Sequence, residues 1–452
     1  MNEDSEDRVY LLGIGGIGMS ALARYFNHQG KKVFGYDKTK TNLTSTLLNE
    51  GINIIYEDDP SQIPWPINRV VYTPAIPDEL ELKKCFLSKG FNLEKRAKVL
   101  GEIANDNFNI AVAGTHGKTS VSSMIAHLLH NGGKPCHAFI GGICKNYNSN
   151  WLHGDEDIAV VEADEFDASF LSLKPDIAVI TAIDSDHLDI YGDHNKLHEA
   201  FEEFASNVHN GGSLFVKDGL NISNNEACIS YSYNKGDCFA QNINFKFDQS
   251  HIPCFHFDLI IKGEIIKGAS IHMPGNHNIE NAVVAAAVAL EMGLDSNAIK
   301  NGLSSFKGIK RRFEFHTYTD PVFIDDYAHH PEEIKVTLDA LRTLYPNKKL
   351  TGIFQPHLYS RTKDFHDDFA KQLSALDELI LLDIYPAREE PIEGVSSELI
   401  FNKLEIKNKK MCKLEQLPGL IKSMKNNIEV LITMGAGDIE KQIPEIKKIF
   451  VK

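Results

Sequence analysis

The sequence predicts an α/β protein of three domains, and three features support that prediction. At roughly 150 residues per domain, a chain of 452 residues makes about three domains. Apolar runs of strand length alternate with segments of helical periodicity, which is the pattern of parallel sheets flanked by helices. Twice, at residues 9–28 and 110–130, an apolar run leads through a glycine-containing turn into a helix. These two turns predict two sites for phosphate-bearing ligands.

The composition argues against several classes of protein. The 47 Lys and Arg against 62 Asp and Glu give a net charge of −15, which argues against a nucleic-acid partner because phosphate backbones require clustered basic residues. Seven cysteines without a Cys-x-x-Cys pair predict free thiols in a reducing cytoplasm. The acidic N-terminus is unlike a signal peptide, and no apolar run approaches the ~20 residues of a membrane helix. We therefore expect a soluble cytoplasmic protein, either a monomer or a dimer, with no membrane partner.

The second glycine turn, GTHGKT at residues 114–119, has the features of an ATP-binding phosphate loop. In such a loop the backbone N–H groups and the helix N-terminus face phosphate, the lysine reaches the terminal phosphates and the threonine hydroxyl holds Mg²⁺. Val112 replaces the usual first glycine, which indicates a narrower class of ATP users; a chance Gly-Lys-Thr in an ordinary turn is the alternative. The predicted ATP-binding residues of the loop are Gly114, Thr115, Gly117, Lys118, Thr119 and Ser120.

The first glycine turn, GIGGIG at residues 13–18, lies between a strand at 9–12 and a helix at 19–28. A second strand at residues 32–36 ends at Asp37, about twenty positions after the glycines, which completes a dinucleotide-type fingerprint. The fingerprint predicts a diphosphate on the helix N-terminus and leaves NAD and a nucleotide sugar as equal alternatives.

Two further residues lie where a diphosphate ligand would be bound. Thr73 follows an apolar run at residues 69–72, a strand end of the kind that collects ligands in open α/β sheets. Arg96 either faces a phosphate or belongs to the solvated start of a helix. The predicted substrate-binding residues of the first domain are Gly15, Gly18, Asp37, Thr73 and Arg96.

Acidic residues and a histidine follow the two strands predicted after the phosphate loop, at residues 158–162 and 177–181. The first strand ends in Glu162, and the segment after the second contains His187. Such side chains at strand ends beside a phosphate loop are where Mg²⁺ ligands belong. We therefore predict Thr119, Glu162 and His187 as metal ligands; the alternative is that both strands end in solvated acidic loops.

The rest of the chain predicts an antiparallel excursion and a third α/β domain. Short, partly alternating runs within residues 212–272 indicate antiparallel strands attached to the parallel sheet. A turn then leads into an alanine-rich helix at residues 279–292, so that His277 and Asn278 read as helix caps on local sequence. Strands alternating with helices return from residue 322 onward.

Domain boundaries are predicted near residues 105 and 309. The first domain covers residues 1–104, the central domain 105–308 and the C-terminal domain 309–452. At the second boundary Arg312 either reaches a phosphate across the junction or belongs to a solvated hinge. The predicted fold is a Rossmann-like N-terminal domain, a central P-loop ATPase-like domain whose mostly parallel sheet carries the antiparallel excursion, and a Rossmann-like C-terminal domain.

Eight motifs follow one another in order along nearly the whole chain. They are GIGGIGM at residues 13–19, GTHGKT at 114–119, EADEFDASF at 162–170, DHLD at 186–189, PGNHN at 274–278 with Asn281, RRF at 311–313, DDYAHHP at 325–331 and QPH at 355–357. Each motif alone is modest, but in this order they closely resemble the Mur ligase family of bacterial peptidoglycan synthesis.

The resemblance implies a ligand for each domain. The first fingerprint would bind the UDP part of UDP-N-acetylmuramate, which decides against NAD. ATP would lie between the central and C-terminal domains, and His187 would help to hold a second Mg²⁺. The implied nucleotide-pocket residues are His277, Asn278, Asn281 and Arg312, and those implied for the acid substrate and the amino acid are Tyr327, His329 and Arg361. The implied catalytic residues are Lys118, His187 and Arg312.

Within the family, the motifs are most similar to those of members that join L-alanine to UDP-N-acetylmuramate. The implied reaction is an ATP-dependent ligation through an acyl phosphate, in cytoplasmic peptidoglycan precursor synthesis. The alternative within the family joins a preformed murein tripeptide to the same nucleotide sugar. A nucleotide-binding scaffold without catalysis and an NAD-dependent dehydrogenase are alternatives from other classes. The chain departs from the family pattern at Glu57-Asp58, at Ala182 and at Leu358, the last of which replaces an arginine.

Overall fold

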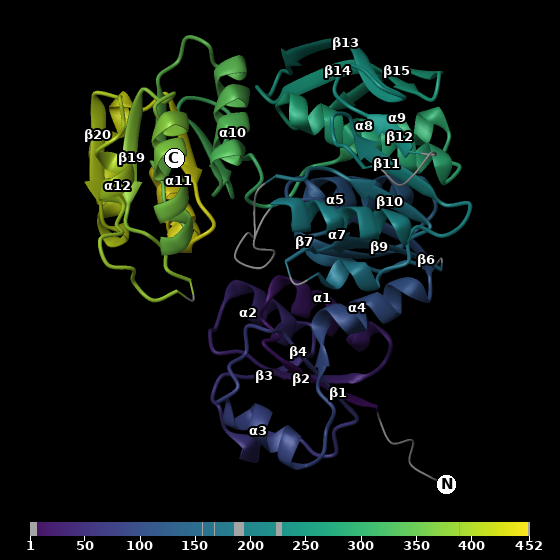
Figure 1. Cartoon of the computed structure of the whole chain (residues 1–452). Coiled ribbons are helices and arrows are strands. Elements are labelled where there is room, and N and C mark those ends of the chain that lie inside the picture. Colours follow the sequence, from purple (N-terminus) through teal and green to yellow (C-terminus); the bar gives the residue numbers. More distant parts are fainter. Residues whose placement is uncertain are drawn as a thin grey trace. The chain divides into compact units, whose positions relative to one another are not determined.

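The structure is a computed structural model that describes residues 7–155, 157–166, 168–184, 194–222, 228–387 and 389–450. Its strands form sheets of five, ten and six strands, which follow one another along the chain and are flanked by helices (Figure 1). Three successive α/β modules with mostly parallel sheets confirm the predicted fold class.

The first sheet is parallel in all its described pairings. Its elements are β1 (Arg8–Leu12), α1 (Ile17–His28), β2 (Lys32–Tyr36), α2 (Asn42–Asn49), β3 (Asn53–Ile55), β4 (Arg69–Tyr72), α3 (Glu81–Ser88), β5 (Glu94–Lys95) and α4 (Arg96–Asn105). The strand order is β3-β2-β1-β4-β5, which reverses between β1 and β4. Open sheets of this type bind ligands at that reversal, next to the predicted glycine turn.

The second sheet has ten strands, with the phosphate-loop strand near its middle. Its elements are β6 (Phe108–Ala113), α5 (Lys118–Asn131), β7 (His137–Cys144), β8 (Ser149–Leu152), β9 (Ile158–Ala163), β10 (Ile177–Ile180), α7 (His194–Ser206), β11 (Ser213–Lys217), β12 (Cys228–Tyr231), β13 (Cys238–Phe247), β14 (Pro253–Ile261), β15 (Glu264–Ile271), α8 (Asn276–Glu291) and α9 (Ser296–Ser305). The order is β15-β14-β13-β12-β11-β10-β6-β9-β7-β8, and β6 pairs in parallel with both neighbours.

The antiparallel excursion is shorter than the sequence predicts. β12 and β13 were both predicted to be part of it, but β12 pairs in parallel with β11 and β13 pairs in parallel with β12, so the parallel sheet extends two strands further. β14 and β15 are neighbours joined by the two-residue turn Lys262-Gly263, a connection that only antiparallel strands accept. β7 and β8 form a second, unpredicted antiparallel pair. Alternating hydrophobicity reports which face of a strand is buried and carries no information about the direction of its neighbour.

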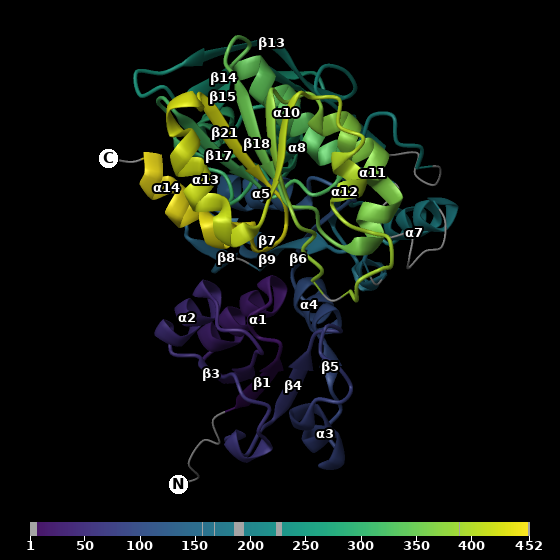
Figure 2. The ribbon, with the colours of Figure 1, turned by 90° about the vertical axis from the view of Figure 1, so that its left-hand side faces the viewer.

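The third sheet is parallel except for its edge strand β16. Its elements are β16 (Glu314–Thr317), β17 (Val322–Asp326), α10 (Pro331–Leu344), β18 (Leu350–Phe354), α11 (Tyr359–Leu373), β19 (Glu378–Leu382), α12 (Glu398–Phe401), β20 (Asn408–Cys412), α13 (Leu417–Met424), β21 (Val430–Met434) and α14 (Ile443–Phe450). The order is β16-β17-β21-β18-β19-β20. Helices α10 and α11 cover one face and α13 and α14 the other (Figure 2). Helix α10 begins at Pro331, a residue whose fixed φ suits the first position of a helix.

The chain divides into two compact units. Unit 1 consists of Met1–Gln241, Leu259–Lys267 and Asn281–Phe306, and unit 2 consists of Asn242–Asp258, Gly268–Glu280 and Lys307–Lys452. Within unit 1, α1 of the first sheet packs on β7 and β8 of the second (Figure 2). Unit 1 thus contains both predicted phosphate sites.

A buried asparagine joins the two sheets of unit 1. Asn150 of β8 donates hydrogen bonds to the Ile17 carbonyl oxygen at 2.5 Å and to the Ser20 hydroxyl at 3.0 Å, and its side-chain oxygen accepts one from Arg24. Arg24 in turn pairs with Glu50 at 2.8 Å. These bonds hold the start of α1, and with it the first glycine turn, against the sheet that carries the phosphate loop.

All seven cysteines have free thiols, as predicted. Burial raises the pKa of Cys136 to about 12, so that this thiol stays protonated at neutral pH. In the part of the chain that the structure describes, no helix is both long and apolar enough to cross a membrane.

The phosphate-loop helix α5 buries a histidine. The Nδ1 atom of His127 lies 2.9 Å from the Tyr147 hydroxyl oxygen, and its Nε2 atom lies 3.0 Å from the Ser305 hydroxyl oxygen on α9. Burial, with a smaller effect of His130, lowers the pKa of His127 to about 4. The imidazole is therefore neutral at neutral pH and joins α5 to α9 as an uncharged hydrogen-bonding group.

We expect the protein to lose stability as the pH falls from about 6.5 to about 4, in part through His127. The unfolded chain binds a proton at this residue below about pH 6.5, whereas the folded protein does so only below about pH 4, so protons favour unfolding in this window. In urea titrations, His127→Gln should lose less unfolding free energy across the window than the wild type, by at most about 3 kcal/mol. Equal losses in the two proteins would contradict the assignment.

Candidate active site

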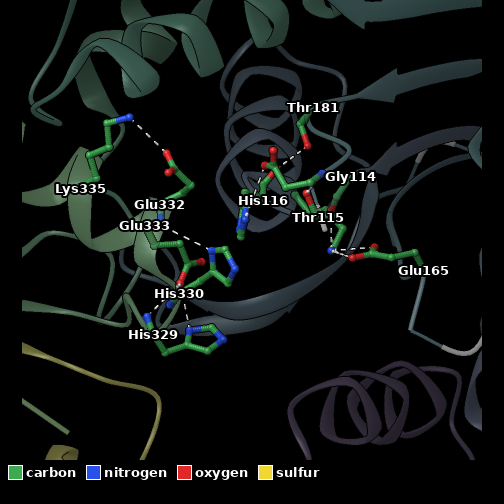
Figure 3. A network of polar contacts seen from close by, with 12 residues as sticks. Gly114, Thr115, His116, Glu165, Thr181, His329, His330, Glu332, Glu333 and Lys335 are labelled. Carbon is green, nitrogen blue, oxygen red and sulfur yellow. Dashed lines mark hydrogen bonds and ion pairs between the residues drawn. The ribbon is translucent and has the colours of Figure 1, made fainter. Parts of the chain in front are cut away.

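The loop at residues 114–117 turns the chain sharply between β6 and α5. Gly114 has a φ of +135° and Gly117 a φ of +86°, values that favour glycine. The Thr181 hydroxyl, just beyond β10, lies against the loop and donates to the His116 carbonyl oxygen (Figure 3). A Cβ at Gly114 would overlap that hydroxyl. The turn therefore needs glycine at this position both for its backbone angles and for space.

Lys118 begins α5 and directs its ammonium group back into the loop. Its Nζ atom lies 2.6 Å from the Gly114 carbonyl oxygen and 2.8 Å from each carboxylate oxygen of Glu165, which points toward the loop (Figure 3). Burial lowers the pKa of Lys118, but the neighbouring carboxylates, chiefly Glu165, outweigh it and raise that pKa. The loop thus holds a permanent positive charge where a terminal phosphate would be bound.

Glu162 is the next-to-last residue of β9. It pairs with Val112 of β6, the strand that leads into the loop, so it lies one strand away from the loop. Its carboxylate accepts hydrogen bonds from the Thr119 hydroxyl at 3.1 Å, the Ser122 hydroxyl at 3.2 Å and the Gly141 N–H. Burial raises the pKa of Glu162, and the Gly141 N–H and Lys118 oppose that rise. A desolvated carboxylate beside a threonine hydroxyl is an arrangement that a cation would stabilise.

Thr119 and Glu162 fit Mg²⁺ as oxygen ligands. Magnesium in nucleotide sites commonly takes one or two protein oxygens and completes its shell with phosphate oxygens and water. Among the residues that the structure describes, no three His, Cys, Asp or Glu side chains form a metal-binding group. His187, the third predicted ligand, lies outside the described residues.

The Asp37 carboxylate, just after β2, holds the first glycine turn in place. Asp37 accepts hydrogen bonds from the Gly15 N–H at 2.9 Å and from the Thr39 N–H at 3.0 Å. Gly18 is the second residue of α1, and a Cβ there would lie 3.0 Å from the Cδ atom of Arg96. Asp37 thus shapes the turn, and Gly18 lets the arginine lie against the helix start. Direct contact of Gly15, Gly18 and Asp37 with a substrate stays a prediction.

A cavity of about 370 Å³ joins the glycine turn to the phosphate loop within unit 1. Gly18, Thr73 and Arg96 line it from the first sheet, and Lys118 and Glu162 line it from the second. Two cationic side chains from different modules therefore face one cavity. Such a space suits a reaction between two phosphate-bearing ligands.

Arg96 makes an ion pair and also lines the cavity. It is the first residue of α4, and its Nη2 atom lies 3.5 Å from the Asp164 carboxylate. The same side chain lines the cavity. The structure confirms the helix start at Arg96, and its contact with a phosphate stays a prediction.

Helix α8 begins at Asn276, three residues before the predicted start, so that His277, Asn278 and Asn281 lie in its first two turns. Asn278 is buried and donates to the Pro274 carbonyl oxygen at 2.6 Å, as a residue that shapes the turn. Asn281 faces the phosphate loop: a Cβ at Gly117 would lie 3.5 Å from its side-chain oxygen. Their contacts with a nucleotide stay predictions.

In unit 2 the adjacent arginines of the RRF motif have different surroundings. The Arg311 side chain is 13% exposed and pairs with the buried Asp325 at 2.9 Å. The Arg312 side chain is 32% exposed, lies 3.6 Å from the Glu333 carboxylate and stands 5.0 Å over the Tyr327 ring. Arg311 is held by the buried Asp325, whereas Arg312 is more exposed, and its contact with a ligand stays a prediction.

Aromatic and imidazole rings gather beyond the ends of β17 and β18. The ring centroids lie 5.2 Å apart for Tyr327 and His329, 5.8 Å for His329 and His357, and 5.8 Å for His357 and Tyr385. The His329 N–H donates to Glu333 at 2.9 Å, and the His329 ring lies beside the same carboxylate (Figure 3). The structure thus brings two predicted residues, Tyr327 and His329, together with three that were not predicted.

Arg361 lies in the first turn of α11, three residues after the helix cap Leu358. Leu358 has a φ of +71°, which is strained for a leucine, and its N–H donates to the Tyr385 carbonyl oxygen at 2.9 Å. Leu358, which replaces an arginine of the family pattern, therefore lies at a strained helix start beside His357. The role of Arg361 stays a prediction.

The other two departures from the family pattern have structural explanations. Ala182 accepts a hydrogen bond from the Thr115 N–H through its backbone carbonyl, at 3.0 Å, so this bond does not depend on the side chain. Asp58 caps α3 by accepting bonds from the N–H groups of Glu81 and Leu82, at 2.8 and 2.9 Å. Neither change removes a contact of the phosphate loop.

Sequence reasoning missed several residues of the site. Glu165 stands in the quoted EADEFDASF motif, but nothing in its local sequence identifies Lys118 as its partner. Gly141, which donates to Glu162, belongs to β7, an unpredicted strand interrupted by two glycines. His357 carried a signal, since it belongs to the QPH motif at a strand end.

The chain matches three family models in succession, each at the place of one sheet. Residues 8–108 match the Mur ligase family catalytic domain, residues 112–289 the Mur ligase middle domain and residues 311–438 the Mur ligase glutamate ligase domain. The chain belongs to the Mur ligase family.

Relatives of this Mur ligase extend over its whole length. The UDP-N-acetylmuramate–L-alanine ligase of Flavobacterium psychrophilum is 47% identical to it over 99% of each chain. The UDP-N-acetylmuramate–L-alanine ligase of Parabacteroides distasonis is also 47% identical, over 98% of this chain and 97% of the relative. The UDP-N-acetylmuramate-alanine ligase of Thermotoga maritima has a similar structure, with a TM-score of 0.82 and 27% identity over 98% of each chain. A murein peptide ligase of Psychrobacter arcticus, with a TM-score of 0.71 and 22% identity over 98% of each chain, shares the fold.

Replacing Gly114 with alanine should abolish nucleotide binding, because the new Cβ overlaps the Thr181 hydroxyl and the backbone angle is strained. Gly133→Ala is the matched control: its φ is +80°, but a Cβ there meets nothing within 4 Å. The control should lose only about 1–2 kcal/mol of unfolding free energy and keep its nucleotide affinity. Calorimetric titration with ADP and Mg²⁺, together with urea unfolding, measures both effects. Normal binding by Gly114→Ala would contradict the steric argument.

Proposed function

We infer that this chain is an ATP-dependent ligase that joins L-alanine to the lactyl carboxylate of UDP-N-acetylmuramate. The observation that carries the inference is the cavity of unit 1, with a phosphate loop at one end and a dinucleotide-type glycine turn at the other. A dehydrogenase would have no use for the phosphate loop, and a simple ATPase would have no use for the second turn. The choice of L-alanine rests on the relatives of that specificity.

The first step brings two anions together. The lactyl carboxylate attacks the γ-phosphate of ATP, and the products are an acyl phosphate and ADP. Arg96 and Lys118 line the cavity from its two modules and place positive charge beside both ligands. Charge that is positioned before the ligands arrive aligns the carboxylate and stabilises the transition state. Mg²⁺, held by Thr119 and Glu162, supplies further positive charge when it is bound.

The second step forms the amide bond. The amine of L-alanine attacks the acyl phosphate, and inorganic phosphate leaves. Water would hydrolyse the same intermediate, so turnover requires that water be excluded while it exists. We assign Arg312 of unit 2 to the ATP phosphates, and Tyr327, His329 and Arg361 to the acid substrate and the amino acid.

A second candidate function joins a preformed murein tripeptide to the same nucleotide sugar. The murein peptide ligase of Psychrobacter arcticus supports it only through a shared fold. The sequence ADEFDASF at residues 163–170 is more similar to the enzymes that add alanine. We therefore rank the tripeptide reaction second.

The purified protein should release inorganic phosphate from ATP in the presence of Mg²⁺, UDP-N-acetylmuramate and L-alanine. Omitting any one component should bring the rate to background, because the phosphate leaves only when an amine captures the intermediate. Glycine, L-serine and the murein tripeptide, assayed side by side with L-alanine, test the amino-acid choice. A preference for the tripeptide would replace the first function with the second, and no amine-dependent release would refute both.

Replacing Lys118 with methionine should reduce kcat by about 100-fold or more, because it removes the charge that faces the transferred phosphate. The exposed Lys246 of β13 provides the control, since Lys246→Met removes the same charge from a solvated strand. Initial rates with saturating substrates compare the variants. A Lys118→Met protein that kept wild-type kcat would remove the loop from the chemistry.

A further inference from the structure

The carboxylate of Glu165 is completely buried and directed at Lys118. Its side chain is 0% exposed, and both of its oxygens lie 2.8 Å from the Nζ atom. The Gly114 carbonyl oxygen, at 2.6 Å, is a further acceptor for the same ammonium group. The loop lysine is thus held by a buried carboxylate, an anion of the chain itself, in the place where a phosphate anion would be bound.

Three carboxylates of one short segment face three different partners. Glu162 accepts from Thr119, on the side of the predicted metal. Asp164 pairs with Arg96 at 3.5 Å, on the side of the glycine turn. Only Glu165 reaches Lys118 with both oxygens. Glu165 therefore has a different partner from Glu162, the predicted metal ligand three residues before it.

We propose that Glu165 is a positioning residue that holds the Lys118 ammonium group in the empty loop and gives it up to the nucleotide phosphates. The proposal rests on the proposed function, because it requires that the loop bind a nucleotide. In the empty protein the ion pair neutralises a buried charge, which is costly to leave unpaired. When a polyphosphate binds, it competes with the carboxylate for the same lysine.

The competition has two measurable consequences. Glu165→Gln keeps the size and one acceptor oxygen of the side chain but removes its charge. The empty variant should be less stable, because Lys118 loses its counter-ion. The variant should bind its nucleotide more tightly, by about fivefold or more, because no carboxylate has to be displaced from Lys118.

The test measures the dissociation constant of a non-hydrolysable ATP analogue with Mg²⁺ by calorimetry, and the midpoint of thermal unfolding with and without that analogue. We expect a lower midpoint for empty Glu165→Gln than for the wild type, a larger rise on adding the analogue, and a lower KM for ATP without a higher kcat. Glu199→Gln is the control, since it makes the same substitution at an exposed carboxylate of α7; its affinity for the analogue should change by less than twofold.

Weaker binding of the analogue by Glu165→Gln would overturn the proposal and make the carboxylate a contributor to nucleotide or Mg²⁺ binding. Unchanged affinity would also overturn it, because the ion pair would then have no link to phosphate. Glu165→Asp keeps the charge but shortens the side chain, and an affinity for the analogue above that of the wild type supports the proposal even if the glutamine variant does not fold. Wild-type protein that binds neither ATP nor its analogue would refute the proposed function itself.

Discussion

The candidate site depends on the backbone of one loop, which must turn sharply between β6 and α5. Gly114 and Gly117 supply the backbone angles, and the Thr181 hydroxyl leaves room for no side chain at the first of them. Because β6 lies between β10 and β9, the loop is next to the ends of both strands. Thr181 from one side and Glu162 from the other therefore reach it without any long connection.

Electrostatic balance is the second constraint on unit 1. The segment at residues 162–165 carries three carboxylates, which would repel one another and any phosphate if they pointed into the same space. The fold instead gives each its own partner: hydroxyl and N–H donors for Glu162, Arg96 for Asp164 and Lys118 for Glu165. Arg96 and Lys118 line the cavity together with Glu162 and Asp164, so that cationic and anionic side chains share its wall.

In unit 2, two adjacent arginines have different partners and different exposure. The buried Asp325 takes Arg311, and Arg312 is left with the partly exposed side of the motif. The same pattern appears at the neighbouring rings, where the Glu333 carboxylate fixes His329 through its backbone N–H and its imidazole ring. In both places a carboxylate to which we assign no ligand fixes a neighbouring side chain: Asp325 fixes Arg311, and Glu333 fixes His329.

The sequence by itself determined the three modules, the sharp glycine turn before α5 and the place of Glu162 in a strand beside it, because buried strands, glycine turns and helix starts such as Pro331 have local signatures. It did not determine the direction of β12 or the existence of β7, since hydrophobic alternation is blind to strand direction and glycines interrupt it. Only the tertiary structure decided which cation meets which carboxylate. Lys118 lies 47 positions from Glu165, and a contact across that distance exists only after the strands have assembled.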